Sequence, residues 1–182
     1  MSTVTAPAVS TWNIDSSHSS VQFKVKHMMI SNVKGEFTAI TGSLKHDSDN
    51  PANSQVEVSI DATSINTRDA QRDTHLKSPD FFHVDQFPTL TFKSTHVSRK
   101  NGELAVTGDL TIHGITRPVT FEVEGPSEPM KDPWGNTRLG LSATARINRK
   151  DFGLTWNAAL ETGGILVGDE VTITLDVQFI KA

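Results

Sequence analysis

Residues 66–88, NTRDAQRDTHLKSPDFFHVDQFP, gather three basic residues, four aspartates and two histidines around a Phe-Phe pair. Side chains of these types could hold a metal, catalyse a reaction or bind the polar end of a ligand. A metal site would draw on His75, His83, Asp73, Asp80 and Asp85. Metal-binding histidines usually lie a few residues apart on one helix face. These two are eight residues apart with a proline between them, so we predict no bound metal.

Nucleophilic catalysis is not indicated either. No Gly-x-Ser-x-Gly elbow occurs, and the adjacent His18 and Ser19 would point to opposite faces of a strand. Asp151-Phe152-Gly153 resembles the magnesium-binding triplet of kinases. The Gly-rich phosphate loop and the His-Arg-Asp loop that accompany this triplet in kinases are missing, so we interpret it as a turn. We therefore predict no catalytic residues and no enzymatic activity.

The composition narrows the classes of protein. A chain of 182 residues with 36% apolar residues and a net charge of −4 fits one folded domain. The absence of cysteine excludes disulfides, thiol nucleophiles and iron–sulfur clusters. No basic cluster occurs, so we expect no binding to nucleic acid, which requires a concentrated positive face.

The first twelve residues, MSTVTAPAVSTW, contain neither the basic residues nor the apolar block of a secretory signal. No stretch approaches the roughly 18 apolar residues of a membrane-spanning helix, so we predict no integral membrane segment. We expect a cytoplasmic protein, or a periplasmic one if the natural chain begins upstream of residue 1.

Apolar residues alternate with polar ones through most of the chain, which predicts about eight strands with one apolar and one wet face. Strands of this kind belong to antiparallel sheets. Asn101-Gly102 and His113-Gly114 are two tight-turn signals between them. The pattern favours a closed barrel or a sandwich. The apolar phase begins at Val21, Val33, Val56, Leu90, Leu104, Val119, Leu139 and Val171.

A break in this alternation between Ala62 and Pro88 predicts a short helical insert across one end of the barrel. Asn66 could cap a helix that begins at Thr67. Ser78-Pro79 looks like the start of a second helix that carries the Phe-Phe pair.

The predicted inner faces mix phenylalanines with small residues. An eight-stranded barrel can be filled by its side chains or can hold one small ligand. The small residues could leave room for an apolar guest, or large and small side chains could simply interdigitate. Both interpretations stay open at this point. The small residues are Gly35, Ala39, Ala62, Ser94, Gly108, Ala143 and Ala145.

Four segments resemble the YceI-like polyisoprenoid-binding family, in the same order along the chain. They are WNIDSSHSSVQFKVKHMMISNVKGEF (12–37), RDTHLKSPDFFHVDQFPTLTFKS (72–94), GDLTIHGITRPVTF (108–121) and RINRKDFGL (146–154). The resemblance implies an all-β, lipocalin-like fold, an eight-stranded antiparallel β-barrel with a short helical insert near one end. It also implies a single lipid-binding barrel domain over residues 12–182, after a flexible segment over residues 1–11.

The family resemblance further implies non-catalytic binding, transport or storage of a long amphipathic isoprenoid lipid, such as a polyprenyl quinone or polyprenyl phosphate, and no other cofactor. We expect the Phe-Phe pair to contact the apolar chain, while Arg68, Arg72 and His75 could meet a polar or phosphorylated head. The two arginines could instead pair with Asp69 and Asp73. The expected apolar contacts are Phe23, Val25, Phe37, Val58, Ile60, Phe81, Phe82, Phe92, Leu110, Ile112, Phe121, Leu141 and Ala143.

Two alternatives remain. An enzyme on the same barrel would need polar groups that converge inside it, and His27 and His96 are the best candidates because they lie on or near the inward phase. A scaffold for protein partners would have a filled interior. A homodimer is compatible with every interpretation.

Overall fold

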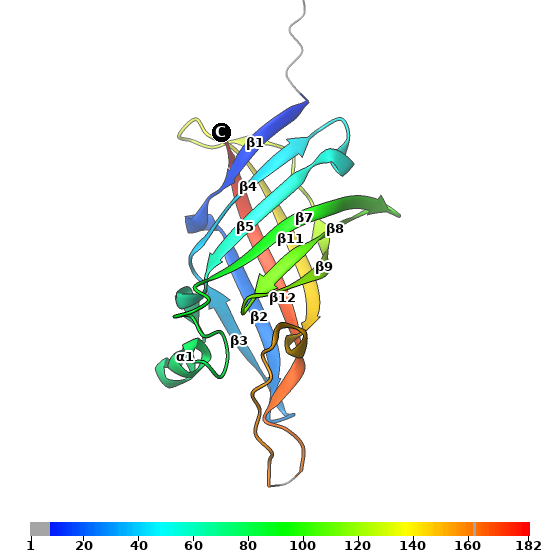
Figure 1. The fold of residues 1–182 in the computed structure, drawn as a ribbon. Coiled ribbons are helices and arrows are strands. Elements are labelled where there is room, and N and C mark those ends of the chain that lie inside the picture. The colour runs from blue at the N-terminus through cyan, green and yellow to red at the C-terminus, as the bar shows by residue number, and fades with distance from the viewer. Residues whose placement is uncertain (1–7, 162) are drawn as a thin grey trace, which may run out of the picture.

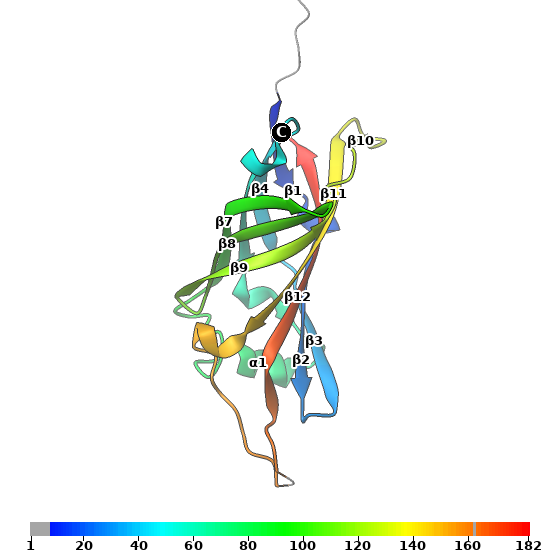
Figure 2. The same cartoon turned by 90° about the vertical axis from the view of Figure 1, so that its right-hand side faces the viewer.

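The computed structural model describes residues 8–161 and 163–182. Its strands form one continuous antiparallel sheet (Figures 1 and 2). They are β1 (Val9–Ile14), β2 (Ser20–His27), β3 (Ser31–Phe37), β4 (Ile40–Asp47), β5 (Gln55–Asp61), β6 (Ile65–Asn66), β7 (Thr89–Lys100), β8 (Glu103–Ile112), β9 (Ile115–Glu124), β10 (Met130–Lys131), β11 (Thr137–Asn148) and β12 (Val167–Lys181).

The helices of the described residues are short. They comprise α1 (Ala70–Lys77) and the 3-10 turns η1 (Ser16–His18), η2 (Pro51–Asn53), η3 (Ala62–Ser64) and η4 (Arg149–Phe152). Across the part of the chain that the structure describes, no helix has the length and apolar character needed to cross a membrane.

Eight of the strands close into an antiparallel barrel, in the order β11-β9-β8-β7-β5-β4-β1-β12 and back to β11. The predicted eight-stranded barrel is confirmed, but two of its members differ. Strands β1 and β4 were not predicted, whereas β2 and β3, which were, lie outside the closed ring. Alternation is weak in both missed strands. Gly42 interrupts the row of apolar residues in β4, and β1 has two apolar residues, Trp12 and Ile14, on its buried face.

Strand β12 joins the ring to an extension below it. One edge of β12 pairs with β11 over nearly its whole length. The other edge pairs with β1 near the C-terminus, where Ile14 opposes Phe179, and with β2 further down, where Ser20 opposes Asp176. The hairpin of β2 and β3 therefore continues the sheet beyond the ring and makes the molecule elongated (Figure 2).

The insert between β6 and β7 contains the predicted helix, but its details differ. Asp69 is the N-cap of α1, and its carboxylate accepts hydrogen bonds from the amides of Gln71 and Arg72. Asn66 is therefore wrong as the cap, and its side chain instead accepts from the amide of Arg68 at 2.9 Å. Ser78 ends α1 rather than starting a second helix. The chain turns back there because the amide of Phe82 donates to the carbonyl of Leu76.

The predicted turns are confirmed. Asn101 and Gly102 have φ of 54° and 79°, as a two-residue hairpin turn requires. His113 and Gly114 do the same between β8 and β9. Asp151 and Phe152 lie in η4, which ends at Gly153 with φ of 73°, so the kinase-like triplet is a turn.

The N-terminal strand begins earlier than the expected domain boundary. Residues 1–7 of the expected flexible segment lie outside the described residues. Val9 already pairs with Asp47 of β4, so residues 9–11 are part of the sheet.

Candidate functional site

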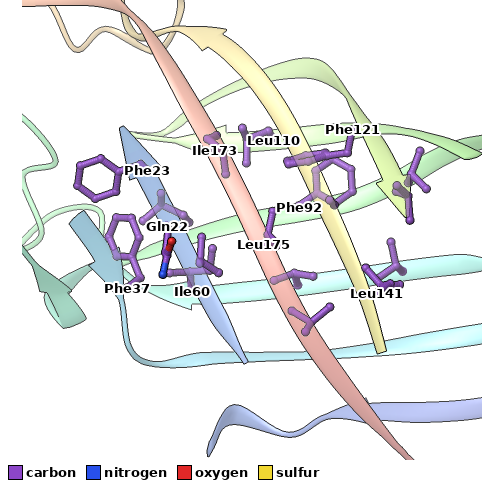
Figure 3. Close-up of a pocket in the computed structure, with 18 of the residues that line it drawn as sticks. Gln22, Phe23, Phe37, Ile60, Phe92, Leu110, Phe121, Leu141, Ile173 and Leu175 are labelled. Atoms are coloured by element: carbon purple, nitrogen blue, oxygen red, sulfur yellow. The ribbon is translucent and has the colours of Figure 1, made fainter. Parts of the chain in front are cut away.

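The interior of the barrel contains a long cavity of about 820 Å³ (Figure 3). Its middle is lined by rings and aliphatic chains, including Phe92 and Phe121, whose ring centroids are 5.1 Å apart. Ile173 and Leu175 line it from β12, yet both remain partly exposed. Inward side chains that keep exposed surface indicate a hollow interior, so the barrel is not filled by its own side chains.

All but one of the residues expected to contact a ligand line this cavity. They come from β2, β3, β5, β7, β8, β9, β11 and the insert. The lining members are Phe23, Val25, Phe37, Val58, Ile60, Phe81, Phe82, Phe92, Leu110, Ile112, Phe121, Leu141, Ala143, Arg72 and His75. Arg68 differs, because its side chain is exposed and lies away from the cavity wall.

Two of the small residues make room for neighbouring rings rather than for a guest. A Cβ at Gly35 would lie 2.3 Å from Cζ of Phe23, and one at Gly108 would lie 2.6 Å from Cζ of Phe92. Both phenylalanines line the cavity. Large and small residues therefore interdigitate within the wall, while the space in the middle stays open.

The insert closes one side of the lower cavity with aromatic contacts. Phe82 packs edge-on against Phe37 of β3, with ring centroids 5.7 Å apart. Phe81 and His75 both pack against Trp156, at 5.4 and 4.7 Å. The Phe-Phe pair therefore ties the insert to two different parts of the chain, the β2–β3 extension and the segment before β12.

Two polar side chains of the insert reach the cavity wall, and both have partners. Arg72 donates through Nε to Oγ1 of Thr67 at 2.8 Å and through Nη2 to its carbonyl at 2.7 Å. His75 Nε2 lies 2.8 Å from a carboxylate oxygen of Asp80. Arg72 thus makes no ion pair with Asp69 or Asp73 and is held in one orientation at the cavity.

The two candidate catalytic histidines do not converge. His27 lines the lower end of the cavity, whereas His96 is exposed on the outside of β7. A β-bulge between Ser94 and His96 shifts the register, so that Val97 rather than His96 points inward. Within residues 8–161 and 163–182, no three His, Asp or Glu side chains gather as a metal site needs.

Arg149 fastens the segment that follows β11 to the lower cavity. Its buried guanidinium donates to the carbonyls of Leu154 at 2.6 Å, Trp156 at 2.8 Å and Gly168 at 2.8 Å. Burial lowers the pKa of this guanidinium, and the nearby carboxylate of Asp169 offsets part of that effect. Arginine stays charged, and its guanidinium has enough donors to reach all three carbonyls.

A second polar cluster braces the upper end, close to the C-terminus. Arg138 of β11 contacts the carboxylates of Asp15 and Asp132, each at 2.6 Å. Hydrogen bonds from Arg138, Ser17 and His18 hold the pKa of Asp15 far below its usual range. Hydrogen bonding to Arg138 likewise lowers the pKa of Asp132. The pairing fixes the β10–β11 hairpin against the end of β1.

Several lining residues were not among the expected contacts. Those of β1 and β4 were missed with their strands, whereas the inward residues of β12 follow an alternation that the sequence does display. Arg99 lies on the wall because the β-bulge of β7 turns it inward. The missed members include Trp12, Ile14, Leu44, His46, Arg99, Arg149, Trp156, Val171, Ile173 and Leu175.

Comparisons with known proteins agree with this architecture. Residues 12–179 match the family described as YceI-like domain. A UPF0312 protein of Staphylococcus aureus is 40% identical over 170 residues, 92% of this chain and 96% of that protein. Among solved structures, Burkholderia cenocepacia BcnA covers 91% of this chain and 98% of its own, with a TM-score of 0.76 and 24% identity.

A more distant structure is described as a polyisoprenoid binding domain from Saccharophagus degradans. It covers 97% of this chain and 100% of its own, with a TM-score of 0.65 and 14% identity. The family match spans nearly the whole barrel, and the chain belongs to the YceI-like domain family.

Proposed function

We propose that this protein binds a long amphipathic isoprenoid lipid, of the polyprenyl quinone or polyprenyl phosphate type, and carries or stores it unchanged. The observation that carries the proposal is the hollow apolar interior of about 820 Å³. Sites for small molecules typically measure about 300–1,000 Å³ and are mostly apolar with a few polar groups. The Saccharophagus degradans domain is only 14% identical to this chain, so the comparison extends to the fold alone. The polyisoprenoid named for that domain is therefore weaker support for lipid binding than the cavity is.

The apolar lining is sufficient for useful affinity without any chemistry. Each buried methylene contributes about 0.8 kcal/mol, and one five-carbon isoprenoid unit, in which two carbons are unsaturated, gives roughly 3 kcal/mol. Association costs at least about 4 kcal/mol, so three or four buried units leave about 5–8 kcal/mol. The upper end of that range corresponds to a dissociation constant of about 1 μM.

Native mass spectrometry of the purified protein, followed by solvent extraction, tests the proposal. We expect a discrete adduct that extracts as a prenyl lipid, or uptake of one equivalent of an added polyprenyl quinone. A clean apo mass with no uptake of either lipid type would overturn the proposal.

We place the head of the lipid at the lower end, beside Arg72 and His75. Arg72 lines the cavity, and a guanidinium suits a phosphate group better than a quinone oxygen. Arg72→Gln should therefore weaken binding of a polyprenyl pyrophosphate far more than binding of a quinone. Arg68→Gln is the matched control, because Arg68 belongs to the same insert but is exposed. Equal losses for both lipids in Arg72→Gln would contradict this placement.

A further inference from the structure

Exposed apolar side chains gather near the lower end of the molecule. The turn between β2 and β3 carries Met28, Met29 and Ile30, of which Met29 is 59% and Ile30 80% exposed. Ile165, also exposed, belongs to the segment before β12, which reaches below the β2–β3 turn (Figure 1). We call these four residues the apolar tip.

The two parts of the apolar tip are in contact. The amide of Met28 donates to the carbonyl of Leu166 at 2.7 Å. A Cβ at Gly164 would lie 2.3 Å from Sδ of Met29, so the methionine packs directly on that glycine. The tip is therefore a single surface built from two chain segments.

The backbone of this turn is unusual for its residues. Met28 and Met29 have φ of 52° and 63°, in the left-handed region that methionine rarely adopts. The turns at Asn101-Gly102 and His113-Gly114 place residues better suited to this conformation. Strained backbone positions cluster at functional sites, and the two here carry exposed apolar side chains.

Three lysines lie on the β2–β3 hairpin, next to the apolar tip. Lys24 of β2 and Lys34 of β3 oppose each other in register, and Lys26 lies one step closer to the turn. Like charges directly across a hairpin destabilise it. Among the described residues, no carboxylate lies within ion-pair distance of these three lysines.

Acidic residues also lie at this end of the molecule, and Glu36 lies on the same face of β3 as Lys34, two residues away. Asp169 lies 3.4 Å from Lys150, and Glu170 lies 4.0 Å from Arg146. Glu161 is exposed on the segment opposite the hairpin. Three lysines against one glutamate leave this face of the hairpin with a net positive charge beside an apolar end, and both features favour binding to an anionic membrane surface.

The apolar tip also adjoins the lower end of the cavity. His27 and Leu166, the direct neighbours of Met28 and Ile165, both line the cavity, as does Lys26. We propose that the tip inserts into the surface of an anionic phospholipid bilayer, with Lys24, Lys26 and Lys34 against the head groups. Exchange of a lipid between the bilayer and the cavity would then occur at this end, a step that rests on the proposed function. Docking itself does not depend on what the cavity holds.

Co-sedimentation with vesicles tests the docking. Wild-type protein should bind vesicles of phosphatidylcholine mixed with phosphatidylglycerol, and salt or removal of the anionic lipid should weaken binding. The double variant Met29→Ser, Ile30→Ser should bind about tenfold more weakly, because it loses the inserting groups. Lys24→Gln, Lys34→Gln should lose most of the salt dependence. All six side chains involved in these variants and in the control are exposed, so folding should persist and is checked by thermal unfolding.

The control lies at the opposite end of the molecule (Figure 2). Met130 and Trp134, on and beside β10, are also exposed apolar residues, but the hairpin lysines are remote from them. Met130→Ser, Trp134→Ser should bind vesicles as the wild type does. Loss of binding in this variant, or full binding in the tip variant, would overturn the assignment of the tip. If the wild-type protein does not bind anionic vesicles, the membrane is not the partner of the tip. The same conclusion follows if the tip variant differs from wild type only by dissociation of a dimer.

A single label gives an independent readout, because the chain contains no cysteine. An environment-sensitive dye on Ile30→Cys should shift to the blue with anionic vesicles, while the same dye on Trp134→Cys should not. Equal shifts would contradict docking through the tip. If the protein binds vesicles but takes up no prenyl lipid, the docking proposal stands and the proposed lipid-binding function is contradicted.

Discussion

Among single residues, Gly35 and Gly108 decide how the cavity wall is built. Each lies beneath a phenylalanine of the neighbouring strand, so the rings of Phe23 and Phe92 lie over backbone rather than over a side chain. The rings thereby face the cavity at a fixed depth. The mixture of large and small residues in the sequence reflects this packing within the wall. It does not predict whether the interior of the barrel is hollow or filled.

Gly108→Ala should destabilise the protein by about 1–3 kcal/mol, the usual cost of overpacking. Its Cβ would lie 2.4 Å from the carbonyl oxygen of Lys93, a backbone atom that cannot move aside. Chemical denaturation measures the change. Gly140→Ala is the control, since its Cβ would meet only the carbonyl of Val177 at an ordinary 3.6 Å and should leave stability nearly unchanged. Equal effects of the two substitutions would contradict the packing described for Gly108.

Arg138 controls the acid sensitivity of the upper end. It lowers the pKa of both Asp15 and Asp132, so these carboxylates stabilise the fold above their unfolded pKa and lose that contribution as pH falls toward the folded values. Arg138→Gln should therefore lower the free energy of unfolding at neutral pH, because it removes both ion pairs. The difference from wild type should shrink below about pH 4, where the unfolded carboxyls become protonated. A difference that stays constant from neutral to acidic pH in urea unfolding would contradict this role.

Whole elements were predicted from the sequence to different degrees. The alternation and the two glycine turns sufficed for β5 and for β7 to β9, because local residues determine both the strand phase and the turn. Strands β1 and β4 depend on pairing with each other and with distant neighbours, and their own alternation is weak. The β-bulge after Ser94 could not be predicted either. Because of it, Val97 and Arg99 lie on the inner face of β7, and His96 lies on the outer face. The cap of α1 was misplaced by three residues because Asn66 and Asp69 are both good caps.

The segment between η4 and β12 depends on one side chain, Arg149. Arg149→Lys should loosen it, because one ammonium group cannot replace the fork that reaches the carbonyls of Leu154, Trp156 and Gly168. We expect faster amide exchange and faster proteolysis within residues 154–166, with the barrel strands protected as in wild type. Lys150→Arg is the control, because Lys150 is more exposed and its ammonium group pairs with Asp169 rather than with the segment's carbonyls. Unchanged exchange in Arg149→Lys would show that the segment is held by other contacts.

For the whole molecule, closure of the sheet and hollowness of the interior have separate causes. Strand number and alternation predict closure, whereas the volume inside depends on the angle and stagger of the strands, which no local pattern encodes. The extension by β2 and β3 lengthens the cavity beyond the ring and brings the insert over it. This elongated cavity agrees with the long lipid proposed above.

Blocking the cavity without disturbing the barrel separates binding from folding. Leu175→Trp places a larger side chain in the middle of the cavity, where Leu175 is already partly exposed and has space around it. The variant should unfold within a few degrees of wild type but should not be stabilised by an added polyprenyl quinone. Wild type should gain about 2.7 kcal/mol at a hundredfold excess of free ligand over its dissociation constant. Thr144→Trp, on the exposed outer face of β11, should respond as wild type does. If Leu175→Trp is stabilised as much as wild type, the lipid binds elsewhere, because a ligand in the cavity and the indole ring would occupy the same space.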